Sequence, residues 1–284
     1  MPEVRALAAD LQSRMRGRTV ERVQLAAFSA LKTFDPPLSA LEGAPCGPVR
    51  TFGKYLDVAL GDLHLVVHLA KAGWIRWHDT MPALGRTGRG PVAARVLLQD
   101  GSGLVLTEAG TKKSLALWLV RAPQEVPGLA TLGPDPLAAD FGADDLAAIL
   151  QSAGRAQIKG VLRNQSLIGG IGNAYSDEIL HVARMSPFKP AAMTREESDR
   201  LYVAVRETLE DAIRRSDGLA AAQLKGEKKT GMRVHGRTGE ACPVCGDTVR
   251  MVRFADNSLQ YCATCQTGGK PLADRAMSKF GVTR

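Results

Sequence analysis

Four of the five cysteines form two Cys-x-x-Cys pairs late in the chain. The pairs are Cys242 with Cys245 and Cys262 with Cys265, and the sixteen residues between them can form a β-hairpin. Two such pairs can close a tetrahedral four-thiolate site, which is the typical donor set of structural zinc. The alternative, two redox pairs, is typical of a βαβ setting that this sequence lacks. We therefore expect one structural zinc ion.

A glycine-rich turn at 169–173 (GGIGN) lies between two predicted helices, 157–164 and 174–184. Glycines let a backbone approach a ligand closely, and amides at a helix N-terminus bind phosphate. The alternative is that the turn only permits close packing of two helices, which is the commoner role of such turns. The residues that we expect at a phosphate backbone are Lys159, Gly170, Gly172 and Asn173.

The chain is basic, with 37 Lys and Arg against 29 Asp and Glu and a formal net charge of +8. This balance favours a polyanionic partner, either nucleic acid or an anionic membrane surface. No apolar run reaches the roughly 18 residues of a membrane span, and the N-terminus lacks the layout of a secretory signal. The sequence therefore predicts a cytoplasmic protein without a membrane partner.

The elements that carry these residues differ between the two halves of the chain. Apolar residues recur at helical spacing from Val4 to Met15, which predicts an N-terminal helix. From 20 to 119, short apolar runs alternate with turn signals such as Gly61-Asp62 and Asp100-Gly101, which predicts β-hairpins of an antiparallel sandwich. We interpret Cys46, His68 and the tryptophans Trp74, Trp77 and Trp118 as packing residues.

The second half is predominantly helical by its periodicity, with helices expected at 144–150, 157–164, 174–184 and 195–215. The basic segment 225–240 has no periodicity and is expected to be a loop. The fold class is therefore α+β. We expect a helix-plus-sandwich domain over 1–128, a hinge over 129–136, a helical domain over 137–225, and a basic loop with the zinc finger over 226–284.

Several motifs, taken in order, resemble the formamidopyrimidine-DNA glycosylase and endonuclease VIII family. They are Met1-Pro2-Glu3, Gly53-Lys54-Tyr55-Leu56, the Gln-x-x-x-Gly-Gly-Ile-Gly-Asn run that ends at Asn173, and the four-cysteine finger. The stretch 157–187 resembles the helix-two-turns-helix unit of that family. The resemblance implies a monomeric DNA-repair glycosylase and abasic-site lyase. Its partner would be duplex DNA with a damaged base or abasic site, bound in a basic cleft between the domains.

The resemblance also implies catalytic roles for three residues. Once Met1 is removed, the secondary amine of Pro2 would attack C1′ of the damaged nucleotide. Glu3 would transfer protons, and Lys54 would hold the phosphate near the lesion. Without the resemblance, Pro2 and Glu3 read as an ordinary helix start and Lys54 as a solvated lysine.

This chain departs from the family pattern at several positions. Relatives carry a second Pro-Glu pair soon after the first, so Pro2 and Glu3 match either the catalytic pair or the second one. Lys71 stands where relatives have a methionine that fills the gap left by the flipped base. Lys112 and Lys113 stand where relatives have an Arg-Arg-Phe segment that probes the DNA. Asn257 stands where relatives have the zinc-hairpin arginine that grips the lesion phosphates. We expect these four residues to contact DNA.

Two other functions remain open at this point. A non-catalytic DNA-binding or damage-binding protein of the same fold would account for the departures, because spread positive charge preserves DNA affinity without catalysis. An RNA-associated or ribosome-associated zinc protein would account for the charge and the four cysteines alone.

Overall fold

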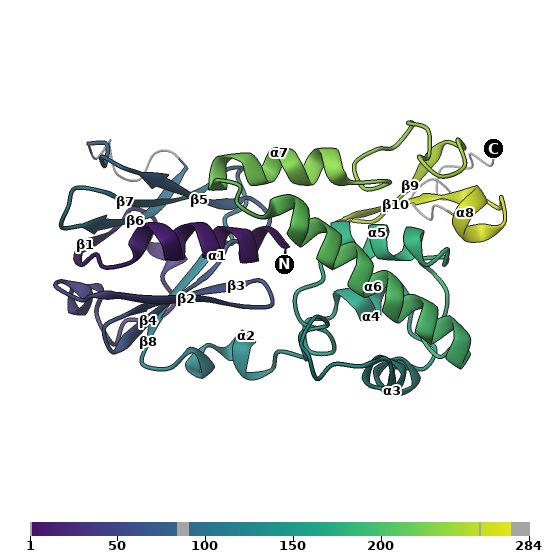
Figure 1. Cartoon of the computed structure of the whole chain (residues 1–284), viewed down its shortest axis with the longest axis horizontal. Coiled ribbons are helices and arrows are strands. Elements are labelled where there is room, and N and C mark those ends of the chain that lie inside the picture. Colours follow the sequence, from purple (N-terminus) through teal and green to yellow (C-terminus); the bar gives the residue numbers. More distant parts are fainter. Residues whose placement is uncertain (1, 84–90, 256, 274–284) are drawn as a thin grey trace. The chain divides into compact units, whose positions relative to one another are not determined.

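The computed structural model describes residues 2–83, 91–255 and 257–273. The described chain forms two compact units (Figure 1). The first, which we call the sandwich unit, consists of the described residues in 2–83, 91–131 and 216–225. The second, the helical unit, consists of 132–215, 226–255 and 257–273. Antiparallel sheets in one unit and helices in the other confirm the predicted α+β class.

The sandwich unit begins with helix α1 (Pro2–Met15). Leu7, Leu11 and Met15 are fully buried, so the predicted apolar stripe faces the core. The helix stops before Gly17, whose φ of 72° suits glycine and breaks the helical path.

Two four-stranded antiparallel sheets follow α1. One has the order β1-β6-β7-β5 and the other β2-β3-β4-β8. The strands are β1 (Val20–Leu25), β2 (Cys46–Phe52), β3 (Tyr55–Leu60), β4 (Leu63–His68), β5 (Gly73–His78), β6 (Val92–Leu98), β7 (Gly103–Glu108) and β8 (Ala116–Val120). The shorter elements are η1 (Phe28–Ala30), η2 (Leu38–Leu41), η3 (Pro123–Glu125) and α2 (Pro127–Ala130). The predicted hairpin turns at Gly61 and Gly101 both have positive φ, and one aliphatic core lies under α1 and both sheets.

The segment 216–225 completes the sandwich core from a distant part of the sequence. Ala221 and Leu224 are buried in that core, and the indole Nε1–H of Trp74 donates to the Ala221 carbonyl over 3.1 Å. These residues open helix α7 (Ala221–Gly231), so the loop expected over 225–240 is wrong as far as Gly231. The apolar anchors of α7 precede the basic run, which explains why the run itself shows no period.

The helical unit contains α3 (Ala143–Ala153), α4 (Ile158–Arg163), α5 (Asn173–Val182), α6 (Arg195–Ser216) and α8 (Ala263–Thr267), with a hairpin of β9 (Val249–Arg253) and β10 (Ser258–Cys262). The four helices predicted from periodicity are confirmed, with ends shifted by a few residues. Almost all of α5 is buried, so this helix is the centre of the unit. Within the described residues, no helix combines the length and apolar character needed to cross a membrane.

Candidate functional site

The four predicted cysteine ligands lie together. Their sulfur atoms are all within 4.8 Å of one another. The Sγ atoms of Cys245 and Cys262 are 3.4 Å apart, and those of Cys242 and Cys265 are 3.8 Å apart. A tetrahedron with metal–sulfur bonds of about 2.3 Å has edges of about 3.8 Å. The four thiols therefore fit a single structural metal ion.

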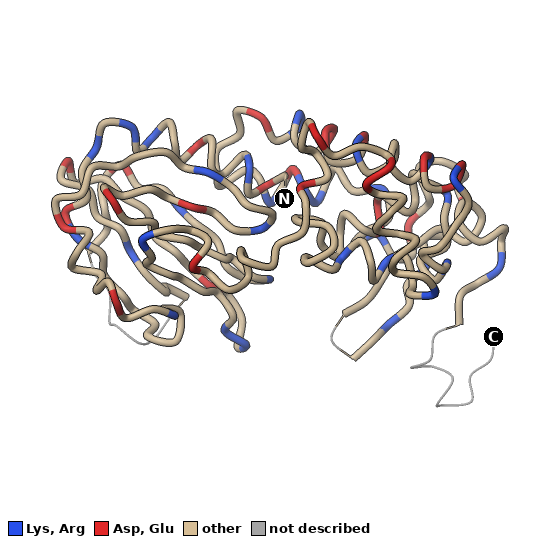
Figure 2. The backbone as a smooth tube through the Cα atoms, turned by 90° about the horizontal axis from the view of Figure 1, so that it is seen from below, with Lys and Arg blue, Asp and Glu red and all other residues tan. Residues whose placement is uncertain are grey.

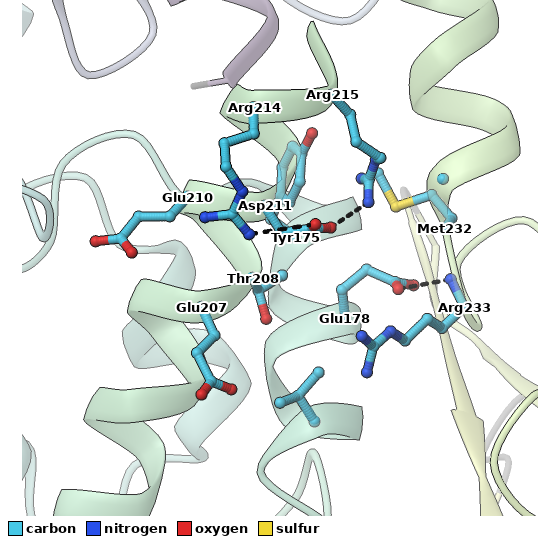
Figure 3. A pocket seen from close by; sticks show the side chains of 12 residues that line it. Tyr175, Glu178, Glu207, Thr208, Glu210, Asp211, Arg214, Arg215, Met232 and Arg233 are labelled. Atoms are coloured by element: carbon cyan, nitrogen blue, oxygen red, sulfur yellow. Dashed lines mark hydrogen bonds and ion pairs between the residues drawn. The ribbon is translucent and has the colours of Figure 1, made fainter.

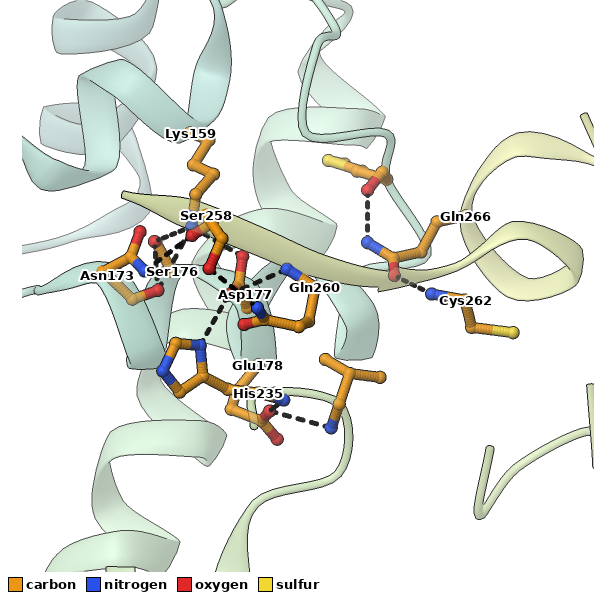
Figure 4. Close-up of polar contacts among 12 residues, drawn as sticks. Lys159, Asn173, Ser176, Asp177, Glu178, His235, Ser258, Gln260, Cys262 and Gln266 are labelled. Atoms are coloured by element: carbon orange, nitrogen blue, oxygen red, sulfur yellow. Dashed lines mark hydrogen bonds and ion pairs between the residues drawn. The ribbon is translucent and has the colours of Figure 1, made fainter. Parts of the chain in front are cut away.

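The metal-binding hairpin is part of the helical unit and packs on α5 (Figure 4). The Glu178 carboxylate accepts the backbone N–H groups of Arg233, Val234 and His235 over 2.6, 3.0 and 2.8 Å. The next carboxylate, Asp177, accepts the backbone N–H of Gln260 in β10 over 3.2 Å. The hairpin and the segment before it therefore pack on α5 within one compact unit, apart from the sandwich unit's core.

Two further side chains tie the cysteines to the helical unit. Gln266 accepts the Cys262 N–H over 2.9 Å and donates its own amide to the Met185 carbonyl over 2.9 Å. His181, near the end of α5, has its Nε2 3.3 Å from Cys242 Sγ. Sequence reasoning missed both residues. For His181 the available signal was a polar residue between apolar neighbours in 179–183, whereas the sequence around Gln266 offers no such signal.

Lys159 lies inside the helical unit and is 5% exposed. Its ammonium donates to Asp177 Oδ1 (2.6 Å), Ser176 Oγ (2.7 Å) and the Asn173 carbonyl (3.1 Å), so its three N–H donors are all used. Burial lowers the pKa of Lys159, and the Asp177 carboxylate opposes that shift. The expectation that Lys159 contacts a phosphate backbone is wrong, because this lysine joins α4 to α5.

The glycine-rich turn is a specific structure that starts α5. Gly170 has a φ of 92°, and its N–H donates to the Gln165 side chain over 2.9 Å. The same Gln165 donates its amide to the carbonyls of Arg163 and Ile171, each over 2.8 Å. Gly172 is the N-cap residue of α5. The turn therefore holds the N-terminus of a buried helix in a fixed position.

The structure brings the turn and the hairpin together. The Asn173 side-chain amide donates to the Ser258 carbonyl in β10 over 2.8 Å. The neighbouring Asn257 closes the hairpin by accepting the Phe254 N–H on its carbonyl over 2.8 Å. The Asn173 side chain thus has a structural partner, while the backbone at the start of α5 lies next to the hairpin loop.

In the sandwich unit, the candidate lysines lie on turns at one end of a sheet. Tyr55 of β3 pairs with His68 of β4, and His68 pairs with Ala116 of β8. Lys54 directly precedes Tyr55, Lys71 follows His68, and the segment with Lys112 and Lys113 leads into β8. The four lysines therefore belong to three turns at the same sheet end.

The N-terminus of α1 lies toward that same end. Cys46 at the start of β2 donates its N–H to the Arg18 carbonyl, and Val49 further along β2 donates to the Gln12 side chain. Helix α1 therefore runs antiparallel to β2. Ten helical residues back from Gln12 span roughly 15 Å, and five strand residues on from Val49 span roughly 16 Å, so Pro2 and Lys54 lie at similar levels.

Burial and hydrogen bonds determine the surroundings of the candidate site residues in the sandwich unit. Pro2 and Glu3 are buried in the first turn of α1, while Met1 lies outside the described residues. Burial lowers the pKa of His68, and the nearby charge of Lys54 lowers it further. The buried Glu108 carboxylate accepts the N–H groups of Ser114 and Leu115 over 2.7 and 2.9 Å, which fixes the turn that carries Lys112 and Lys113.

A pocket of about 340 Å³ lies elsewhere in the helical unit, among α5, α6 and the chain from the last residue of α7 to Arg233 (Figure 3). Among its lining residues, Asp211 accepts from both Arg214 and Arg215. None of the residues predicted to have a functional role lines this pocket.

Three family models match the chain. The formamidopyrimidine-DNA glycosylase N-terminal domain matches 1–111, and the H2TH domain of the same enzyme matches 132–223. The zinc finger found in formamidopyrimidine-DNA glycosylase and isoleucyl-tRNA synthetase matches 239–268. Together they cover both units.

Named relatives agree with these matches. Formamidopyrimidine-DNA glycosylase of Symbiobacterium thermophilum is 34% identical over 277 residues, covering 94% of this chain and 88% of the relative. An uncharacterized formamidopyrimidine-DNA glycosylase-like protein of Mycobacterium tuberculosis is 58% identical over 150 residues, covering 52% of this chain and 93% of the relative.

Solved structures share the fold along nearly the whole chain. The MutM (Fpg) protein of Thermus thermophilus is 32% identical with a TM-score of 0.79, covering 95% of this chain and 99% of that one. The Lactococcus lactis enzyme, solved non-covalently bound to DNA containing an abasic site, is 25% identical with a TM-score of 0.81, covering 94% and 99%. The chain is therefore a member of the formamidopyrimidine-DNA glycosylase family.

Proposed function

We propose that this protein is a DNA glycosylase that removes oxidised or ring-opened bases from duplex DNA and then cleaves the abasic site as a lyase. The main supporting observation is that α1 runs antiparallel to β2, which brings its N-terminal Pro2 level with the turn that carries Lys54. An amine and a phosphate-binding cation are the two groups that such a reaction needs close together.

The chemistry starts with the Pro2 secondary amine, free after removal of Met1. Its nitrogen forms a bond to C1′ while the bond from C1′ to the base breaks, and the electron pair leaves with the base, which takes up a proton. Glu3 protonates the ring oxygen as the sugar opens, and the Pro2 nitrogen loses its proton to give an iminium. Loss of a C2′ proton then expels the 3′ phosphate by β-elimination.

The remaining contacts are with the DNA backbone and the unpaired partner base. Lys71, Lys112 and Lys113 would meet the duplex from the sandwich unit, since they share the sheet end with Lys54. Gly170, Gly172 and Asn257 would meet it from the helical unit. Backbone N–H groups at the start of α5 are suited to phosphate, and Asn173 would hold them against the hairpin.

We further propose that the metal held by the four cysteines is zinc, with a structural role. Four thiolates leave no open coordination position, so the ion would stabilise the hairpin and take no part in the reaction. We expect the protein to act as a monomer, in the cytoplasm on nucleoid DNA.

Borohydride trapping on abasic-site DNA tests the lyase. Protein that starts at Pro2 should give a covalent adduct, because borohydride reduces an iminium to a stable amine. Protein that keeps Met1 should give none, since its Pro2 nitrogen is an amide. Pro2→Gly should retain some trapping through its own primary amine. The nucleophile assignment fails if processed protein binds abasic DNA yet yields no adduct.

A non-catalytic damage-binding protein is the second candidate. Two departures from the family pattern favour this candidate: Lys71 stands in place of an apolar residue, and the second Pro-Glu pair is missing. Normal affinity for abasic DNA without a borohydride adduct or strand cleavage would establish it. A preference for RNA over duplex DNA in competition would instead favour an RNA-associated zinc protein.

A further inference from the structure

His181 is a buried histidine beside the four-cysteine site. It is 2% exposed, and its Nε2 lies 3.3 Å from the sulfur of Cys242. Its other ring nitrogen, Nδ1, is also buried and has no hydrogen-bond partner. The two ring nitrogens therefore have very different surroundings.

Those surroundings determine which nitrogen carries the proton. A metal-bound thiolate has no proton, so a hydrogen bond between the two groups requires the N–H on His181 Nε2. A second N–H on Nδ1 would be buried without an acceptor, which is costly. The consistent form is a neutral imidazole that donates from Nε2 to sulfur.

We propose that His181 is an outer-sphere ligand of the metal centre, donating a hydrogen bond to the metal-bound thiolate of Cys242. This inference rests on the proposed zinc site. The hydrogen bond withdraws negative charge from the sulfur, which makes the thiolate harder to protonate and less reactive toward electrophiles.

Helix α5 also contacts the hairpin of the proposed DNA-binding region. Its first residue, Asn173, bonds to Ser258 in the hairpin, and Asp177 bonds to Gln260 one turn later. His181 makes the third contact, one further turn along and directly to a metal ligand. Figure 4 shows the contacts of Asn173 and Asp177 with the hairpin, and the contact of His181 with Cys242 continues this series along α5.

Zinc release to a chelator tests the proposal. His181→Phe keeps an aromatic ring at this position and removes the donor, so the variant should lose zinc about 10-fold faster or more. His181→Gln carries an amide N–H at a similar distance from the backbone and should restore much of the slow release. Ser198→Ala is the control, because it removes another buried polar group of the helical unit that has no hydrogen-bond partner.

A second measurement uses the unmodified protein, in case His181→Phe does not fold. With cadmium-113 in place of zinc, NMR should detect a scalar coupling from the metal through the Cys242 sulfur to the imidazole N–H of His181. Wild-type release in the Phe variant, or absence of this coupling in metal-loaded protein, would overturn the role of His181. A metal content well below one equivalent in folded wild-type protein would overturn the proposed zinc site instead.

Discussion

At the scale of the residue, what a lysine can do depends on where its three N–H donors are used. Lys159 and Lys112 were both expected to contact DNA, and both stand in basic stretches of sequence. Lys159 is buried and bonded to Asp177, while Lys112 is exposed on a turn. Sequence alone could identify the four cysteines, because thiolate spacing defines the site, but it could not separate these two lysines.

Lys159→Met should destabilise the protein by about 3–5 kcal/mol, because it leaves the buried Asp177 carboxylate without its cation. Urea unfolding measures this change. Lys112→Ala is the matched comparison: it should change stability by less than about 0.5 kcal/mol and reduce the slope of log affinity for DNA against log salt by about 1. Equal stabilities of the two variants would contradict the structural role of Lys159.

Cys46 should be an unreactive thiol. Desolvation by burial raises the pKa of Cys46 to about 11, so only a small fraction is thiolate near neutral pH. Metal-loaded protein should therefore react slowly with a thiol reagent at pH 8, and Cys46→Ala should remove the slow reaction that remains. Rapid reaction of one equivalent in wild type, lost in Cys46→Ala, would contradict this expectation.

At the scale of the element, periodicity predicted helices and hairpins well, since a core face repeats every 3.6 or 2 residues. Helix α7 escaped prediction because tertiary contacts at Ala221 and Leu224 hold it, with no stripe along the basic run. The hydrogen bonds from α5 to the turn at 233–235 and to the hairpin were also unpredictable, because each joins residues more than fifty positions apart.

Glu178→Gln should loosen the turn that leads to the metal site. A carboxylate can accept the three N–H groups of 233–235 on two oxygens, whereas an amide offers one oxygen. We expect a loss of about 1–3 kcal/mol and faster hydrogen exchange at these amides. Glu207→Gln, on the exposed side of α6, should leave exchange at 233–235 unchanged. Unchanged exchange in Glu178→Gln would show that the carboxylate does not hold the turn.

The burial of His68 in β4 and its proximity to Lys54 predict that the stability of the protein depends on pH. The pKa of His68 lies below 6.5, chiefly from burial and then from Lys54, so the folded state binds fewer protons than the unfolded state. The stability that this histidine contributes is present above pH 6.5 and falls as the pH drops toward the folded pKa. His68→Asn should flatten that fall in urea unfolding. Lys54→Met should raise the His68 pKa in NMR titration, and an unchanged value would contradict their proximity.

At the scale of the whole molecule, the metal should stabilise the helical unit as well as its own hairpin. Chelation of the metal removes the bonds that hold the four cysteines together. Because His181, Asp177 and Glu178 of α5 bond to this region, α5 should lose stability as well. Hydrogen exchange should accelerate in β9, β10 and α5, and DNA affinity should fall. The sandwich unit has its own core and should keep its protection. Accelerated exchange confined to β9 and β10 would contradict this transmission.

The discontinuous sandwich unit has a consequence for biosynthesis. Its core includes Ala221 and Leu224, yet the rest of that core is complete in sequence by residue 131. At roughly 5–20 residues per second, the ribosome needs about 5 to 20 seconds to deliver the missing segment. Throughout that interval the nascent sandwich exposes the apolar surface that α7 later covers, including the indole of Trp74. The sandwich unit is therefore translated first, but its folding ends only after α3 to α6 have been made. Premature termination before residue 221 leaves an incomplete, aggregation-prone sandwich.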